Sequence, residues 1–391
     1  METIVIGVNH NNALGLIWSL HEAGHNVNLL IRESKQGYIG KSKYVDNIYF
    51  CDDDNKLIAK IKQTCCKLGE KPVVFVSGDT DATILNNHFQ ELIPYCYFEG
   101  GRSDGSINKY RDKNIGNELA KKCGFTLPKN VVIKKKEELY SVNLSYPLFI
   151  KANNSVHGGK VAMKKCDTYE EAKHFIDDLP NDFFPLQVQE FVDKEYEIML
   201  LGCSLYGGKK VICPIANRKI RQYPKYVGLV SFGESLAVRH HAALMSLRAR
   251  ISLYLKEIEY TGLFSAEFLF SKGKYYFLEI NLRNDGTSWL STCSGYNLPD
   301  MVCRSFVDDN VSDDECSFVK KYYVNIYADL KCLRSGEITL YKWLKQFNKD
   351  LCYSHYNPRD KWPMYIYVKG ILFKCLKNRM RNLLPHKNSQ Q

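Results

Sequence analysis

Residues 265–283, SAEFLFSKGKYYFLEINLR, predict a β-hairpin. Two alternating runs rich in Phe, Leu and Tyr flank a turn signal at residues 271–274. A turn centred near Gly273 places Glu267 opposite Glu279, with Cβ atoms roughly 5 Å apart, and Asn281 points to the same face as Glu279. Two carboxylates and one amide oxygen at a single point suit Mg²⁺, although a solvated acidic strand face has the same pattern.

The composition is that of an ordinary soluble protein. The 391 residues are 45% hydrophobic and 25% charged, and this length allows two or three domains. No run of about 18 apolar residues occurs, and the start METIVIGVNH lacks the features of a signal peptide, so we expect a cytoplasmic protein. The 14 cysteines form no CxxC pair, which favours reduced thiols over a disulfide framework or a zinc site.

The positive charge is concentrated at the C-terminus. Residues 331–391 contain 13 Lys and Arg against 3 Asp and Glu, a net charge of +10 in a chain whose total is +11. We therefore predict no nucleic-acid partner for the protein as a whole. Residues 364–384, MYIYVKGILFKCLKNRMRNLL, mix apolar and basic residues. They predict either a helix that lies on the inner face of an anionic membrane or a helix docked on the core with a solvated basic side.

The N-terminal residues predict a doubly wound α/β unit. Two buried-strand patterns, at 3–8 and 26–31, flank a helical pattern at 13–23. Gly7 and Gly15 do not form the GxGxxG fingerprint, so a dinucleotide-dependent oxidoreductase is disfavoured.

A glycine-containing loop separates two predicted strands in the middle of the chain. The strand PLFIK at 147–151 runs into ANNSVHGGK at 152–160, and another short strand follows. Such a loop can donate backbone N–H groups to phosphates, but a plain hairpin turn fits as well. Lys151 ends a buried run, where a charge is costly unless it finds a partner.

Six motifs in order resemble the ATP-grasp superfamily of ATP-dependent ligases. They are Asp112-Lys113, PLFIK with Lys151, Gly158-Gly159-Lys160, QEFVDKEYEI at 189–198, SAEF at 265–268 and FLEINLR at 277–283. KEYE and EINLR are similar to the synthetase halves of the carbamoyl-phosphate synthase large chain and to single-unit relatives such as D-aspartate ligase. The resemblance covers roughly residues 1–310, and Leu282 stands where the family usually has Pro.

The resemblance implies a mixed α/β and α+β architecture. Residues 1–105 would form an N-terminal doubly wound domain that precedes the ATP-grasp domain. Residues 106–310 would form the ATP-grasp domain, with a small lid subdomain at about 126–190. Residues 311–391 would be a basic C-terminal extension without a family counterpart.

The resemblance also implies which residues contact the nucleotide phosphates. Lys113 and Lys151 would reach them as compact point charges, and Arg283 would contact the transferred phosphoryl group, so Lys151 and Arg283 are the predicted catalytic residues. The loop that covers the phosphates would include Ser155, Gly158, Gly159 and Lys160.

The rest of the nucleotide and its metal would be bound by the hinge and the hairpin. Glu190, Phe191 and Val192 would contact the adenine, and Glu195 would bind the ribose. The ligands of Mg²⁺ or Mn²⁺ would be Glu267, Glu279 and Asn281.

The implied activity is ATP-dependent joining of a carboxylate to an amine through an acyl-phosphate. Both substrates would be small molecules, such as an amino acid or a cell-envelope precursor, and self-association into a homodimer is left open. Arg218, Lys219 and Arg221 are candidates for binding an anionic substrate, because Arg binds carboxylates bidentately. If this segment is a strand, Lys219 and Arg221 share one face and Arg218 points to the other. The alternative is a non-catalytic ATP-binding regulatory or scaffold protein on the same fold.

Overall fold

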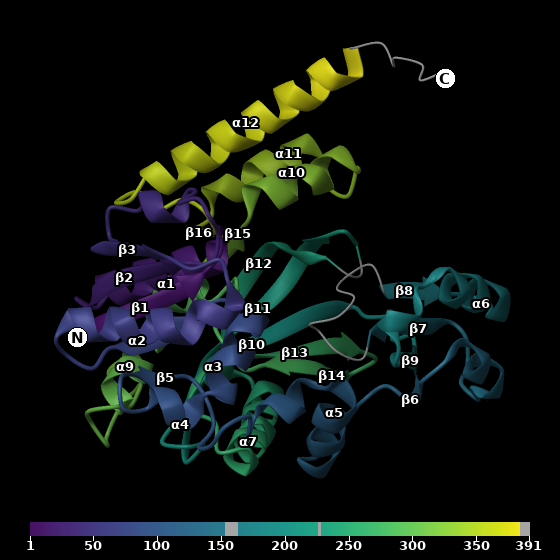
Figure 1. Ribbon diagram of the computed structural model, residues 1–391. Coiled ribbons are helices and arrows are strands. Elements are labelled where there is room, and N and C mark those ends of the chain that lie inside the picture. The colour runs from purple at the N-terminus through teal and green to yellow at the C-terminus, as the bar shows by residue number, and fades with distance from the viewer. Residues whose placement is uncertain (153–162, 226–227, 384–391) are drawn as a thin grey trace, which may run out of the picture.

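The chain folds around three β-sheets, which Figure 1 shows in the computed structural model. The structure describes residues 1–152, 163–225 and 228–383, with the backbone alone for 374–383. A five-stranded parallel sheet lies at the N-terminus, a seven-stranded sheet lies at the centre, and a four-stranded antiparallel sheet stands to one side. This combination confirms the predicted α/β and α+β class.

The N-terminal sheet is doubly wound, as residues 3–8 and 26–31 predicted. Its strands run parallel in the order β3-β2-β1-β4-β5. The elements are β1 (Glu2–Gly7), α1 (Asn11–Glu22), β2 (Asn26–Ile31), β3 (Asn47–Phe50), α2 (Leu57–Leu68), β4 (Val73–Val76), α3 (Asp79–Asn87), α4 (Phe89–Leu92) and β5 (Tyr97–Phe98). Val5 packs with α1 on one face, whereas Ile4 and Ile6 pack with α2 and α3 on the other. Burial on both faces explains why these strands read as continuous apolar runs.

The start of α1, close after β1, contains asparagines where a dinucleotide fold has glycines. The Asn12 side-chain amide donates to the backbone oxygens of Ser77 (2.8 Å) and Asn284 (3.0 Å), and the Asn11 amide donates to that of Gly286 (2.7 Å). These two asparagines therefore fix residues 284–286, which follow the hairpin at 265–283, against the N-terminal sheet and its helices.

The central sheet has the order β14-β13-β10-β11-β12-β15-β16. Its strands are β10 (Tyr196–Leu205), β11 (Lys210–Tyr223), β12 (Leu229–Ala237), β13 (Gly262–Ser271), β14 (Lys274–Asn281), β15 (Tyr322–Val324) and β16 (Leu351–Tyr353). Helices α5 (Lys113–Lys122) and α7 (Ala242–Glu257) pack on one face. Helices α8 (Trp289–Cys293) and α9 (Leu298–Ser305) pack on the other face of the central sheet. They share one hydrophobic core with that face and with α1.

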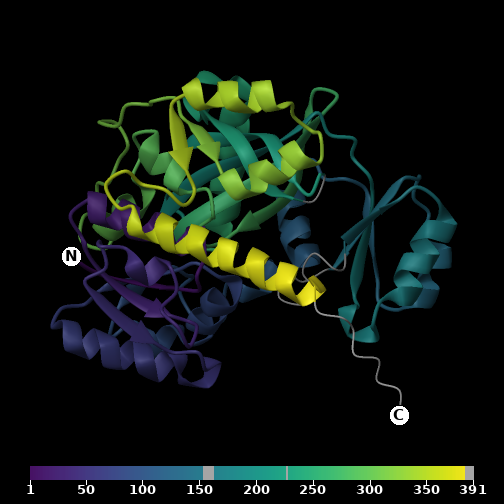
Figure 2. The ribbon, with the colours of Figure 1, turned by 90° about the horizontal axis from the view of Figure 1, so that it is seen from above.

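The four-stranded sheet forms a separate lobe within the range expected for a lid. It consists of β6 (Asn130–Ile133), β7 (Leu148–Ala152), β8 (Met163–Cys166) and β9 (Leu186–Glu190), in the order β6-β9-β7-β8, with α6 (Tyr169–Asp178) beside it. Its hydrophobic core is its own, and Figure 2 shows it set apart from the rest of the molecule.

The C-terminal extension is joined to the central sheet. Strand β15 pairs with β12 and β16 pairs with β15, while α10 (Ile326–Arg334), α11 (Leu340–Lys345) and α12 (Trp362–Leu383) lie above them in Figure 1. Asp329 on α10 accepts two hydrogen bonds from Arg221 on β11, both at 2.9 Å. Within the described part of the chain, no helix is long and apolar enough to cross a membrane.

Candidate nucleotide and metal site

The β13–β14 hairpin pairs Glu267 with Glu279, as the sequence predicts. The pairing arises differently from the prediction, because the turn is formed by Lys272 and Gly273, both with positive φ, and would by itself align Glu267 with Leu278. A β-bulge between Glu267 and Phe268 leaves Leu278 without a partner and restores the Glu267–Glu279 pair.

The donor set around this pair fits a hard divalent cation. Asn281 lies opposite Ser265, and its amide nitrogen donates to the Ser265 hydroxyl at 3.2 Å, so its carbonyl oxygen is the atom suited to a cation. Burial raises the pKa of Glu267, and the nearby Glu279 carboxylate adds to that effect against the opposing charge of Lys219. Among the described residues, no group of three or more His, Cys, Asp and Glu could hold a metal ion, so this site would rely on the amide and on ligand oxygens.

Two buried lysines converge on the carboxylate pair. Lys113 begins α5, where Asp112 caps the helix, and its ammonium donates to the backbone oxygen of Ala152 at 3.3 Å. Lys151 is the fourth residue of β7 and is 7% exposed. Burial lowers the pKa of Lys151 to about 7, and repulsion from Lys113 contributes, whereas Glu279 acts in the opposite direction.

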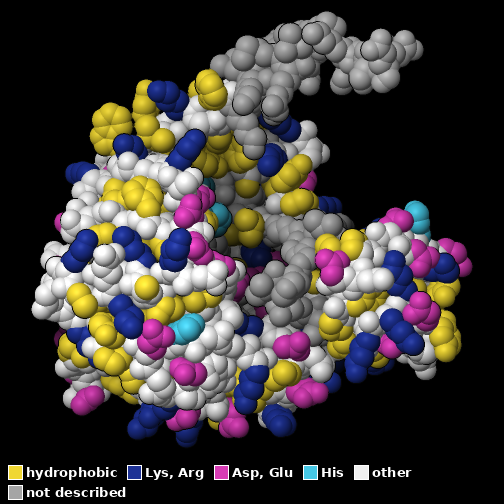
Figure 3. Space-filling view, in the orientation of Figure 1, with side chains coloured by type: hydrophobic (Ala, Val, Ile, Leu, Met, Phe, Trp, Pro, Cys, Tyr) yellow, Lys and Arg dark blue, Asp and Glu magenta, His cyan; other side chains and the backbone are white. Residues whose placement is uncertain are grey.

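A cavity with about 820 Å³ of empty volume lies between the lid sheet and the central sheet. Lys113, Lys151, Glu267 and Glu279 supply charged groups to its wall. Apolar side chains line the rest, among them Phe149, Met163, Phe191, Val192, Leu269 and Leu278. In Figure 3 a hollow is visible between the main body and the lid.

The predicted hinge joins β9 to β10 at the edge of this cavity. Phe191 and Val192 line the cavity, whereas Glu190 does not and forms an ion pair with Lys129 at 3.6 Å. Glu195 also lies outside the lining, because its carboxylate accepts a hydrogen bond from the backbone N–H of Lys272 at 2.9 Å. Glu195 thereby connects the hinge to the turn of the hairpin.

The sequence did not predict a group of ion pairs that lies next to the Glu267–Glu279 pair. Lys219 donates to Glu197 at 2.6 Å and to Glu267 at 3.1 Å, and Lys194 also binds Glu197. Burial opposes the charge of Lys219, but the two carboxylates outweigh burial and raise its pKa. Alternation along residues 217–222 placed Lys219 and Arg221 on one face of a strand. It could not identify the partners of Lys219, because Glu197 lies on β10 and Glu267 lies on β13.

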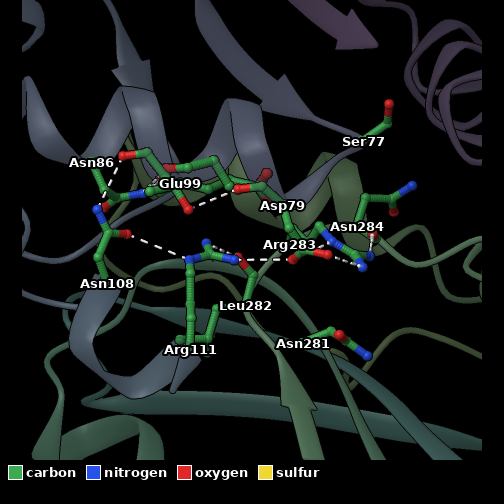
Figure 4. Close-up of polar contacts among 12 residues, drawn as sticks. Ser77, Asp79, Asn86, Glu99, Asn108, Arg111, Asn281, Leu282, Arg283 and Asn284 are labelled. Atoms are coloured by element: carbon green, nitrogen blue, oxygen red, sulfur yellow. Dashed lines mark hydrogen bonds and ion pairs between the residues drawn. The ribbon is translucent and has the colours of Figure 1, made fainter. Parts of the chain in front are cut away.

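Arg283 is held at the boundary with the N-terminal domain. Figure 4 shows its guanidinium turned toward Asp79, which accepts hydrogen bonds from it at 2.8 Å through both carboxylate oxygens. A third donor reaches the backbone oxygen of Asn284 at 2.9 Å. Arg111 also binds Asp79, at 3.0 Å. Burial alone would raise the pKa of Asp79, but the two guanidinium groups hold it below its usual range.

The two arginines predicted to bind substrate lie outside the cavity. Arg218 forms an ion pair with Glu234, and Arg221 is bound to Asp329 of the C-terminal extension. The structure therefore brings together the two lysines, the two carboxylates and the apolar hinge residues, but not these arginines. The predicted loop residues Ser155, Gly158, Gly159 and Lys160 lie outside the described residues.

Comparisons with known proteins agree on the fold. Residues 118–295 match the family model of the ATP-grasp domain. Among solved structures, an L-amino acid ligase from Bacillus licheniformis has a TM-score of 0.60 at 16% identity, over 78% of this chain and 73% of that one. A biotin carboxylase from Campylobacter jejuni reaches a TM-score of 0.63 at 16% identity, over 80% of this chain and 73% of that one. A search of curated proteins found no match.

A third similar structure was solved with nucleotide and metal. It is the biotin carboxylase domain dimer of the 2-oxoglutarate carboxylase from Hydrogenobacter thermophilus, in complex with MgADP, ADP and bicarbonate. Its TM-score is 0.64 at 17% identity, over 81% of this chain and 73% of that one. At these identities the likeness establishes the fold that the motifs predicted.

Proposed function

Because residues 118–295 match the family model of the ATP-grasp domain, we propose that this protein is an ATP-dependent ligase that joins a carboxylate to an amine. The observation that carries the proposal is the convergence of Lys113 and Lys151 on the Glu267–Glu279 pair in one cavity. Positive groups for phosphates and oxygen ligands for a cation then face the same volume, as phosphoryl transfer requires. Free, mostly buried thiols support a reducing compartment such as the cytoplasm.

Each end of the cavity has its own role in this proposal. The apolar hinge, with Phe191 and Val192, would receive the adenine, while Lys113 and Lys151 would bind the phosphates together with the loop that contains Ser155 and Lys160. Glu190 and Glu195 frame the hinge, and we propose that Glu195 exchanges its backbone partner for a ribose hydroxyl.

The hairpin would hold the metal. Glu267, Glu279 and Asn281 would bind Mg²⁺ or Mn²⁺, which neutralises phosphate charge when bound. Lys219 and Glu197 would orient Glu267 from behind. Arg283, two residues beyond Asn281, would reach the transferred phosphoryl group on release from Asp79.

The proposed reaction has two steps, and the positions of these residues support it. A substrate carboxylate attacks the terminal phosphorus of ATP, ADP leaves, and an acyl-phosphate forms. The amine then attacks the acyl carbon, phosphate leaves, and an amide bond forms. The residues act by positioning and by charge neutralisation, so no nucleophilic side chain is needed.

The test is a panel of amino acids and small carboxylic acids incubated with ATP, Mg²⁺ and an amine donor. We expect ADP release with one class of acid and a product whose mass equals acid plus amine minus water. An acid labelled with ¹⁸O should transfer one label to the released phosphate, which reports the acyl-phosphate. ADP binding without turnover across the panel would instead support the non-catalytic alternative.

The Lys151 ammonium makes nucleotide affinity dependent on pH. The pKa of Lys151 in the free protein is lowered to about 7, so its charge is complete only below that value. Bound phosphates raise this pKa again, and binding above pH 7 must therefore take up a proton. We expect the Kd of MgADP to be flat below pH 7 and to rise by up to about tenfold per pH unit above it.

Calorimetry in two buffers of different protonation enthalpy measures this uptake directly. At pH 8.5 the wild type should take up close to one proton per MgADP, and Lys151→Met should take up almost none. Lys272→Met, at the exposed hairpin turn, is the matched control and should behave as the wild type. Equal proton uptake by wild type and Lys151→Met would contradict the assignment.

A further inference from the structure

Helices α11 and α12 present an apolar outer surface that no described residue covers. This surface, called the α11–α12 face, consists of Leu340, Tyr341, Leu344, Trp362, Tyr365 and Phe373. Each of these side chains exposes between 54% and 73% of its area. Figure 2, seen from above, shows the three C-terminal helices lying uncovered on the molecule. Several large exposed apolar side chains on two helices at the same end of the molecule indicate an interaction site.

The attachment of α12 to the core does not account for this surface. The inner side of the helix uses Met364, Tyr367 and Ile371, which line an apolar cavity against α10 and the region after β16. Trp362, Tyr365 and Phe373 lie on the opposite side of the helix at helical spacing. The outer face is therefore additional to what docking on the core requires.

The same two helices and their flanks also carry exposed basic side chains. Lys342 and Lys345 on α11, and Lys361 and Lys369 at α12, are all exposed. Four acidic residues occur between 326 and 373, and two of them, Asp329 and Asp360, are buried and bonded to Arg221 and Trp18. The other two are exposed, and Asp350 among them pairs with Lys321. The sequence of 374–391 adds five Lys and Arg and no Asp or Glu. The face is thus both apolar and cationic.

This combination distinguishes between two kinds of partner. A second copy of the chain related by a twofold axis would bring the same lysines against each other, which is unfavourable. An anionic bilayer accepts the lysines at its headgroups and the apolar side chains just below them, and Trp and Tyr favour that boundary. Without a membrane-spanning helix among the described residues, the contact would be peripheral.

We propose that the α11–α12 face binds the surface of an anionic lipid bilayer. Apolar insertion by Trp362, Tyr365 and Phe373 and electrostatic attraction by the exposed lysines act together, since two such contributions are needed for stable peripheral binding. The proposal concerns the C-terminal extension and does not depend on the ligase activity.

Co-sedimentation of the full-length protein with phosphatidylcholine vesicles, with and without phosphatidylglycerol, tests this proposal. We expect the wild type to pellet with the anionic vesicles, to stay in solution with the neutral ones, and to be released by added salt. Trp362→Ser/Tyr365→Ser should lower the partition coefficient at least about tenfold. Lys342→Gln/Lys369→Gln should lower it by about thirtyfold, from roughly 1 kcal/mol for each lysine.

Matched substitutions elsewhere control for general loss of hydrophobicity and charge. Tyr140→Ser/Leu253→Ser removes exposed apolar groups from the lid and α7, and Lys209→Gln/Lys274→Gln removes exposed lysines from the central sheet. Both controls should bind as the wild type does, and thermal melting should show all variants folded. A wild type that stays in solution, or binds neutral vesicles equally, would overturn the proposal. A dimer in light scattering that Trp362→Ser/Tyr365→Ser dissociates would instead assign the face to a second copy.

Discussion

Glu279→Gln is expected to lower ATP turnover at least about 10³-fold while the protein stays folded. The substitution keeps the shape of the side chain but removes one of the two charges that face each other across the hairpin. A cation at this position supplies several kcal/mol of charge stabilisation, and each 1.36 kcal/mol corresponds to about tenfold in rate. Folding should not suffer, because the change relieves repulsion with Glu267, whose pKa is already raised by burial and by Glu279.

The measurement compares ADP formation, with the acid identified in the panel, for wild type, Glu279→Gln and Glu257→Gln. Glu257 is an exposed carboxylate at the end of α7, and its variant should keep full activity. In binding experiments, Mg²⁺ should strengthen the affinity of the wild type for ADP but not that of Glu279→Gln. Turnover by Glu279→Gln at the wild-type rate would show that the hairpin is not the metal site.

Lys219→Met should destabilise the protein by about 3–5 kcal/mol, the usual cost of leaving a buried charge without its partner. Lys219 neutralises Glu197, which is buried, and Glu267, which is half-buried, and both carboxylates lie within hydrogen-bonding distance of it. Without the ammonium, Glu197 keeps Lys194 as a partner, whereas burial raises the pKa of the Glu267 carboxyl group further above its unfolded value. The resulting loss of unfolding free energy is complete above the pKa that this carboxyl group has in the folded protein, and it disappears below the pKa that the group has in the unfolded chain. The loss should therefore shrink as the pH falls toward 4.

Thermal unfolding across pH 4–8 checks this prediction. The double variant Lys219→Met/Glu267→Gln should recover part of the stability lost in Lys219→Met, because the carboxylate that loses its lysine is gone. Lys209→Met, at an exposed position, serves as the control and should leave the melting temperature unchanged. A loss for Lys219→Met that does not vary with pH would point to packing rather than charge.

The sequence predicted the parts of the site that depend on short-range order. The sequence of residues 265–283 predicted the pairing of Glu267 with Glu279, although the observed turn produces that pair only together with the bulge at Leu278. The buried run before Lys151 indicated a lysine that needs a partner. Both inferences use neighbours within one hairpin or one strand, where the period of two fixes the face.

Contacts between distant segments could not be predicted in this way. Alternation assigned Arg221 to a face, but its partner Asp329 lies 108 positions further along and reaches it only because α10 packs on β11. In the same way, Asp79 binds Arg283 across 204 positions. The guanidinium groups of Arg221 and Arg283 therefore each bind a carboxylate from a distant segment, and local alternation cannot predict such a partner.

The bulge in β14 bears on how such hairpins can be compared between proteins. Leu278 is surplus to the hydrogen-bonded ladder, although its side chain lines the cavity. A chain lacking that one residue would still set the same two acids against each other in an unbroken ladder. Alignments with distant relatives that lack the bulge should therefore place a one-residue gap at Leu278, immediately before Glu279. A scoring scheme that forbids gaps inside strands would align Glu279 with the wrong residue.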